Sequence, residues 1–173
     1  MMIIWSFGSF AFFMVPFYLN KVKGNIYYLS FATEFAEFLA SVICFFIQKF
    51  MELKRALLLF CAMIAGGSFG MLFIAKEMVS DEASDSGGYM NVGLILLTNL
   101  GIVAAFDIAY LINAELFPTI LLATAYGCCN ILGRAVTIMS PVAAVLPQPL
   151  PLVILLIFAI LCSFLSLFLI KIK

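Results

Sequence analysis

The 173-residue sequence contains no histidine and few charged residues. Without histidine, it lacks the commonest metal ligand and the side chain that most readily carries protons near neutral pH. Charged residues make up 10% of the chain, against about a quarter in an average soluble domain. The nine basic residues balance the nine acidic ones and form no long basic run, so we expect no nucleic-acid binding.

Cysteine is present but in no pattern that suggests chemistry. All five cysteines fall inside apolar runs, in neither a disulfide framework nor a zinc-ligand spacing, so we expect small buried thiols. No nucleophile paired with a base and no cluster of metal ligands is apparent. We therefore expect neither an enzyme nor a bound cofactor or metal. The cysteines are Cys44, Cys61, Cys128, Cys129 and Cys162.

What the sequence has in excess is hydrocarbon. Hydrophobic residues make up 66% of the chain and the mean hydropathy is +1.23. A water-soluble fold of this length could not bury so much apolar surface. The composition predicts an integral, multi-pass membrane protein. Composition does not identify the membrane; our expectation is the plasma membrane, with an organelle membrane as the alternative.

Six apolar runs have the length of a membrane-spanning helix, which needs about 20 residues. Helices satisfy their own backbone hydrogen bonds in lipid, and the period of two expected of barrel strands is not visible. The first run lacks the basic start and cleavage motif of a signal peptide. The sequence therefore predicts an all-α, six-transmembrane-helix bundle that occupies residues 1–173 as one domain. The predicted spans are 2–19, 26–48, 56–76, 91–113, 118–145 and 151–170.

The loops suggest an orientation. With six spans both termini lie on one side of the membrane, and that side holds five basic residues against three on the other. Because lysine and arginine in short loops favour the cytoplasm, we expect both termini there. The five are Lys49, Lys54, Arg55, Lys171 and Lys173, and the three are Lys21, Lys23 and Lys76.

The second, fourth and fifth predicted spans carry charged residues in their interiors or just past an end, whereas the third and sixth carry none in their interiors. Such residues are costly in lipid and usually face a partner or a water-filled path. We therefore expect these three helices to line a polar cavity, while the third and sixth face lipid. The charged residues are Glu34, Glu37, Asp107, Glu115 and Arg134.

Each of these residues also has a structural interpretation. Arg134 is either paired with Asp107 or another acid, or it anchors a carboxylate-bearing substrate, which suits a guanidinium. Glu34 and Glu37 share a helix face and either reach headgroup water or face the cavity. Glu115 lies near the end of its span, where an interfacial structural role is expected.

Two further patterns concern packing. Tyr110, together with Tyr126 and Trp5, either packs in the bundle or lines the cavity. In the third span, Ala62, Gly66 and Gly70 recur at four-residue spacing, which predicts a small-residue face for close helix contact.

The stretch NAELFPT at residues 113–119 resembles the end of the tenth helix in the organic ion transporter family of the major facilitator superfamily. The family pattern there is close to [NT]-A-E-[LI]-[YF]-P-T. Arg134 follows Thr119 by fifteen residues, and Ser140-Pro141 come next, at offsets that the family shares. Anion- and carnitine-type members carry arginine at that position and organic cation members carry aspartate. The resemblance thus implies an anionic or zwitterionic substrate.

A second stretch, GNIYYLSFATEFAEF at residues 24–38, is similar to the start of the family's eighth helix. The family glutamate, thirteen residues after the glycine, corresponds to Glu37, and Glu34 is an additional acid one turn earlier. Asp107 stands where the family often has asparagine or glutamine. The resemblance covers nearly the whole chain as helices seven to twelve. It implies a missing N-terminal six-helix half, in the same or another chain, with the substrate held between the halves.

The cytoplasmic side departs from the family pattern. The loop D-R-x-G-R-[RK] reads QKFMELKR here, which keeps Lys54 and Arg55 but loses the aspartate and the glycine. The arginine three residues after Pro-Thr is Leu122. Both features belong to the family's charge network for gating, so Lys54, Arg55, Glu115 and Pro118 become candidate gating or structural residues.

Together these features predict half of a transporter that moves small organic ions across the lipid bilayer by alternating access. The altered cytoplasmic motifs leave an alternative, a non-transporting membrane subunit or truncated paralogue with a structural role in assembly. A channel is less favoured, because no TVGYG-like filter and no arginine-rich voltage sensor is present. The candidate substrate-binding residues are Arg134, Glu37, Asp107, Glu34 and Tyr110.

Overall fold

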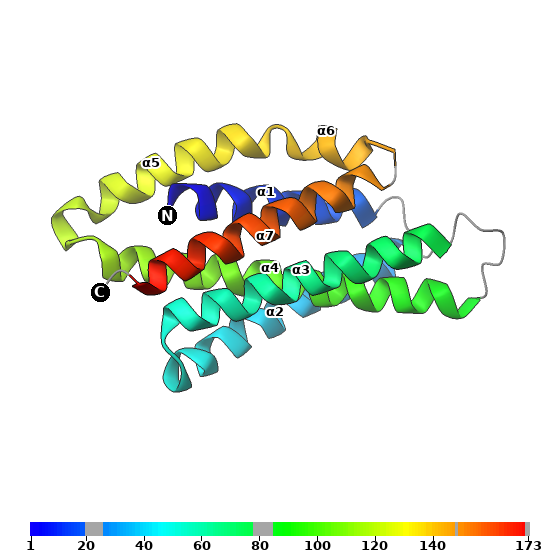
Figure 1. Ribbon diagram of the computed structural model, residues 1–173, viewed down its shortest axis with the longest axis horizontal. Helices are drawn as coiled ribbons and strands as arrows, with labels where there is room; N and C mark the ends of the chain where they lie inside the picture. The colour runs from blue at the N-terminus through cyan, green and yellow to red at the C-terminus, as the bar shows by residue number, and fades with distance from the viewer. Residues whose placement is uncertain (20–25, 78–84, 148, 172–173) are drawn as a thin grey trace.

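A computed structural model describes residues 1–19, 26–77, 85–147 and 149–171. Throughout these ranges the regular structure is α-helical, and the all-α prediction is confirmed (Figure 1). The helices are α1 (Met2–Leu19), α2 (Ile26–Phe50), α3 (Leu53–Glu77), α4 (Asp85–Leu116), α5 (Thr119–Thr137), α6 (Ser140–Val145) and α7 (Leu150–Lys171).

Most of these elements are long and apolar enough to cross a membrane. Five stretches of the described chain meet that criterion, with α5 and α6 counted together, and Met2–Phe17 of α1 is a shorter apolar helix. The start of α1 and the end of α7 lie toward the same end of the bundle, as an even number of crossings requires (Figure 1). The chain is therefore an integral, multi-pass membrane protein.

The fifth predicted span, residues 118–145, is a single leg that is broken into α5 and α6. Pro141 causes the break, since it has no backbone N–H to bond the carbonyl four residues earlier. The chain tightens just before it, where the Met139 N–H bonds the Val136 carbonyl at 3.0 Å. The ladder resumes beyond it, where the Ala143 N–H bonds the Met139 carbonyl at 2.9 Å.

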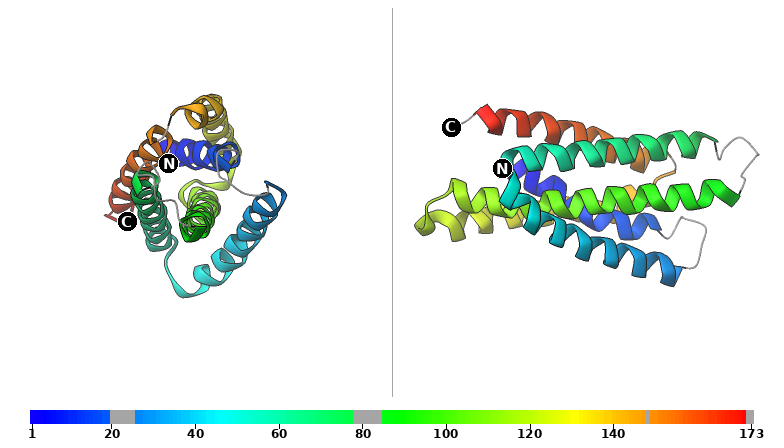
Figure 2. Two further views of the ribbon diagram at one scale, coloured as in Figure 1. Left: turned by 90° about the vertical axis from the view of Figure 1, so that its right-hand side faces the viewer. Right: turned by 90° about the horizontal axis from the view of Figure 1, so that it is seen from below.

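Seen end-on, the helices are arranged around a central pair, α1 and α4 (Figure 2). α3 and α7 pack on each other and cover one side of this pair. α2 lies along α4, and α5 with α6 lies along α1. Because α2 and α5 diverge, no other helix of the described chain covers the side of the central pair between them (Figure 2). We call it the open side, and the helices α2, α4 and α5 that border it carry Glu37, Asp107, Tyr110, Tyr126 and Arg134.

The apolar core lies on the opposite side, among α1, α3, α4 and α7. Its largest side chains are fully buried, and the burial of each contributes about 1.5–3 kcal/mol relative to exposure in water. They include Leu57, Phe60, Ile64, Ile102, Ile108 and Leu155. In lipid the same contacts stabilise the bundle through close packing rather than through water exclusion.

Glycine brings α3 and α4 together, but not at all the residues that the sequence suggested. A Cβ at Gly67 would collide with the Thr98 side chain, and one at Gly70 would lie 3.2 Å from Leu94. Gly66 has no atom within 4 Å of its Cβ position, and Ala62 is exposed. The predicted close-contact face is thus wrong for Ala62 and Gly66. One residue along a helix is a rotation of about 100°, and Gly67 is the residue turned toward α4.

Candidate functional site

Two side-chain hydrogen bonds join α2 to α4 along the open side. Asn99 Nδ2 donates to Glu37 Oε1 at 3.2 Å, and Ser41 Oγ donates to Asp107 Oδ2 at 3.0 Å. Both carboxylates are half-buried. Glu37 and Ser41 are one helical turn apart, so both hydrogen bonds lie in the same interface between α2 and α4, which we call the α2–α4 seam. The structure therefore brings together two of the acids that the sequence singled out.

Asn99 and Ser41 were missed by the sequence analysis. Asn99 is 1% exposed, and its Oδ1 has no hydrogen-bond partner among the residues that the structure describes. The sequence did contain an indication for Asn99. It precedes Asp107 by eight residues on the same predicted helix and therefore lies on a similar face of that helix. Neither residue is charged, so a search for intramembrane charges alone passes over both.

The α2–α4 seam leads to a measurable coupling. In a double-mutant cycle of Glu37→Ala and Asn99→Ala, we expect a favourable coupling energy of about 0.6–1.7 kcal/mol, the range found for hydrogen bonds between membrane helices. Thermal unfolding of the purified protein in detergent would provide the measurement.

The matched control pairs Asn99→Ala with Ser163→Ala. Ser163 lies on α7, and its hydroxyl bonds a carbonyl of its own helix, that of Ala159, at 2.9 Å. Residues that share no partner normally contribute additively, so this cycle should show no coupling. Additive effects in the Glu37–Asn99 cycle as well would rule out the hydrogen bond as a stabilising contact.

An aromatic cluster lies beside this seam, where α1, α4 and α5 meet. The Trp5 ring lies 4.1 Å from that of Tyr110 and 5.5 Å from that of Tyr126, between ring centroids. The Tyr126 hydroxyl donates to the Tyr110 backbone carbonyl at 2.7 Å. Trp5 is fully buried, whereas Tyr110 is 39% exposed. Trp5 therefore packs inside the bundle, whereas Tyr110 is partly exposed, as a residue that lines a cavity would be.

Arg134 lies on α5, two turns beyond Tyr126 on the same general face. Its side chain is exposed, and its guanidinium carbon lies over the Phe13 ring, 5.6 Å from the centroid. Within the described residues it makes neither an ion pair nor a hydrogen bond, so the pair with Asp107 is not formed. The guanidinium therefore keeps its positive charge and all its N–H donors available.

The remaining candidates lie farther from this arrangement. Glu34 is exposed, one turn before Glu37 on α2. Glu115 is exposed near the end of α4, and Pro118 is the N-cap residue of α5 with an extended backbone. Proline suits that position because backbone N–H groups at the start of a helix have no intrahelical acceptor, so the N–H that proline lacks is not needed there.

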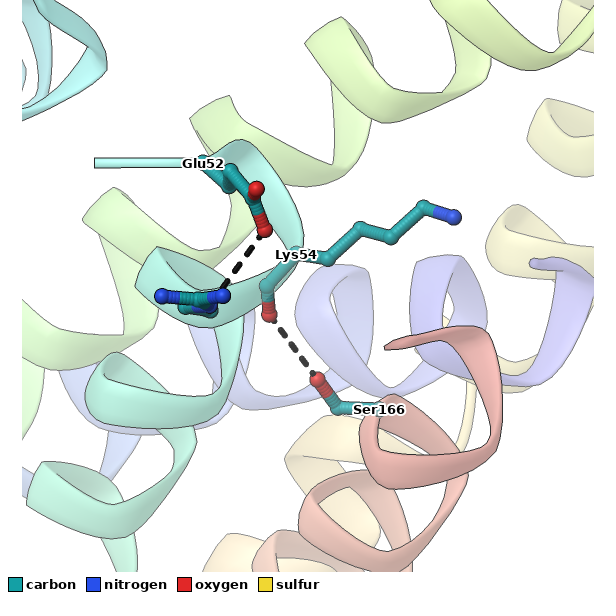
Figure 3. A network of polar contacts seen from close by, with 4 residues as sticks. Glu52, Lys54 and Ser166 are labelled. Carbon is teal, nitrogen blue, oxygen red and sulfur yellow. Dashed lines mark hydrogen bonds and ion pairs between the residues drawn. The ribbon is translucent and has the colours of Figure 1, made fainter. Parts of the chain in front are cut away.

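The two basic candidates lie at the turn between α2 and α3. Arg55 Nε pairs with Glu52 Oε2 at 3.3 Å, with both side chains largely exposed. The Lys54 carbonyl accepts a hydrogen bond from Ser166 Oγ of α7 at 3.4 Å (Figure 3). Glu52 thus places an acid within the α2–α3 turn. The hydrogen bond from Ser166 to the Lys54 carbonyl joins α7 to the start of α3.

The fold and its charged face define a class of protein. Acids lie on α2 and α4, a cation lies on α5, and aromatic rings pack where α1, α4 and α5 meet. Helices α3 and α7 carry no charged residue in their interiors, although α2 and α5 expose large apolar side chains just as α3 and α7 do. Such segregation of charge is typical of proteins that pass polar solutes through a membrane.

Comparison with known proteins makes the relationship specific. No protein-family model matches the chain. The chain is 24% identical over 138 residues to solute carrier family 22 member 4 of Mus musculus. It is 27% identical over 139 residues to organic cation/carnitine transporter 2 of Rattus norvegicus, and 26% identical over 138 residues to the Homo sapiens transporter of that name. Each match covers 80% of this chain and 23% of the relative.

These findings confirm the resemblance drawn from the sequence motifs. The homologues of this chain are organic cation/carnitine transporters of solute carrier family 22, in the major facilitator superfamily. They are transporters rather than enzymes. The match to this chain spans less than a quarter of the length of each of these three relatives.

Proposed function

We propose that this chain forms part of a transporter that moves small organic ions across the membrane by alternating access, with anionic or zwitterionic substrates favoured. One observation carries the proposal. The helices that border the open side, α2, α4 and α5, carry charged side chains, and Arg134 has no ionic partner among the described residues. A charge held unpaired in a membrane protein is usually kept for a ligand.

The open side would be one wall of the substrate cavity. Transporters of this superfamily bind substrate near the membrane midplane between two six-helix halves. In the proposal, α1, α2, α4 and α5 face the cavity, and α3 and α7 face lipid. The missing N-terminal six-helix half, in the same or another chain, would supply the opposite wall.

Each candidate residue has a role that suits its chemistry. Arg134 would bind a substrate carboxylate through its guanidinium fork. Glu37, Asp107 and Glu34 would attract a positive group, and Tyr110 would offer it an aromatic face. Lys54, Arg55, Glu115 and Pro118 would act at the ends of the helices, as gating or structural residues.

Transport sorted by charge tests this function. The chain, with whatever sequence flanks it in its gene, would be reconstituted in liposomes and supplied with labelled benzoate, glycine betaine or tetramethylammonium. We expect benzoate and glycine betaine to accumulate above protein-free liposomes, and tetramethylammonium to accumulate least. Uptake of tetramethylammonium alone would contradict the anionic or zwitterionic preference.

The same experiment separates the alternative. A folded, correctly inserted protein that moves none of the three probes would contradict a transport function. Stable assembly into a larger membrane complex under those conditions would favour the non-transporting subunit.

A further inference from the structure

The position of Arg134 depends on a close contact between α5 and α1. At Gly133, a Cβ would lie 3.0 Å from Ser9 Oγ and 3.2 Å from Trp5 Cδ1. Glycine therefore lets the α5 backbone approach α1 at this level. The next residue, Arg134, then extends its side chain across α1, where the guanidinium carbon lies 5.6 Å from the centre of the Phe13 ring.

The Phe13 ring is itself held in place. It packs edge-on against Phe12, with ring centroids 5.3 Å apart and an interplanar angle of 88°. Phe13 is half-buried, and the Arg134 guanidinium carbon lies over its ring. A cation within about 6 Å of an aromatic centroid is attracted by the negative face of the ring.

We propose that Phe13 is the positioning residue for the anion-binding group, and that it orients the Arg134 guanidinium without neutralising it. A carboxylate in the place of Phe13 would hold the guanidinium more strongly but would cancel its charge and occupy its donors. A ring face leaves the charge and the N–H fork directed to a ligand. The inference rests on the proposed anion role of Arg134 and adds the residue that sets its affinity.

A Phe13 side chain that served only for packing would give a different result from one that orients Arg134. If Phe13 only fills space, leucine should replace it without affecting anion binding. If the ring face matters, leucine should weaken anion binding and tyrosine should restore it, because both phenylalanine and tyrosine present a π face.

The experiment uses the fact that the chain has two arginines, Arg55 and Arg134. The chain, together with whatever sequence flanks it in its gene, would be treated in detergent with phenylglyoxal, which modifies arginine, and the modification of Arg55 and Arg134 would be quantified by mass spectrometry. Benzoate would be added as the protecting anion. Arg55, at the α2–α3 turn, serves as the internal reference in every sample.

In the wild-type protein, benzoate should protect Arg134 selectively. In Phe13→Leu, the benzoate concentration for half-protection should rise by about two- to fivefold, the change expected for loss of one cation–π contact. Phe13→Tyr should return it to the wild-type value. The matched control, Phe17→Leu, changes an exposed phenylalanine on the same helix and should have no effect.

Two outcomes would overturn the inference in distinguishable ways. Selective protection that is unchanged in Phe13→Leu, or weakened equally in Phe13→Tyr, would remove the role of Phe13 and leave the anion role of Arg134 standing. No protection of Arg134 in the wild-type protein would overturn both. If Phe13→Leu does not yield folded protein, Phe13→Met carries the same expectation.

Discussion

Arg134→Ala should lower uptake of benzoate and glycine betaine by at least about tenfold, while uptake of tetramethylammonium stays the same or rises. The loss of one desolvated charge pair with a ligand typically costs affinity on this scale or more. The substitution also leaves the acids Glu37 and Asp107 on the helices that border the open side. Their unopposed negative field repels a carboxylate and attracts a cation.

Two companion variants make this result specific. Arg134→Lys keeps the charge but loses the planar fork, so uptake of carboxylates should be intermediate. Leu132→Ala lies on the same helix, where the side chain is 44% exposed and points about 200° away from Arg134 around the helix axis, and should behave as wild type. Carboxylate uptake that survives in Arg134→Ala would eliminate Arg134 as the anion-binding residue.

Gly67→Val is expected to be the most damaging single change to the fold. A Cβ at residue 67 collides with Thr98, whose hydroxyl donates to the Leu94 carbonyl at 2.8 Å and whose β-branched side chain has few alternatives. Either Thr98 turns and loses that bond, or α3 and α4 move apart. Overpacking of this kind typically costs about 1–3 kcal/mol, which thermal unfolding in detergent would detect.

The neighbouring glycine provides the control for this substitution. Gly66→Val adds the same side chain to the same helix at a position with no atom within 4 Å. It should leave the unfolding temperature close to that of the wild type. If the two variants unfold at the same temperature, the α3–α4 contact does not depend on Gly67.

The fold class could be predicted from the composition and from the length of the apolar runs, because the need to satisfy backbone hydrogen bonds in lipid acts within each segment. A long apolar segment in lipid must pair its own backbone groups, and only a helix does so along a single segment. The predicted spans accordingly match α1, α2, α3, α4 and α7 to within a few residues, apart from the extra length at the start of α4. The break between α5 and α6 was not predicted, although Pro141 was noted in the sequence. Proline within a membrane span is often tolerated, so its presence alone does not predict a break.

The candidate site was predictable in part. Intramembrane charge singled out Glu37, Asp107 and Arg134, since such residues are rare in lipid whatever their surroundings. Their partners could not be found in this way. Ser41 is 66 positions from Asp107 in the sequence and Asn99 is 62 from Glu37, and no local pattern connects residues that far apart.

By itself, then, the sequence determined that the chain is an all-helical membrane protein, which of its spans carry charge, and which transporters it resembles. Only the tertiary structure decided what each of those charges meets. It set Arg134 over Phe13 rather than beside Asp107, and it turned Gly67 rather than Gly66 toward α4. The physical reason is rotational. A step of one residue turns a side chain by about 100°, and the rotation of each helix is set by the packing of all its neighbours together.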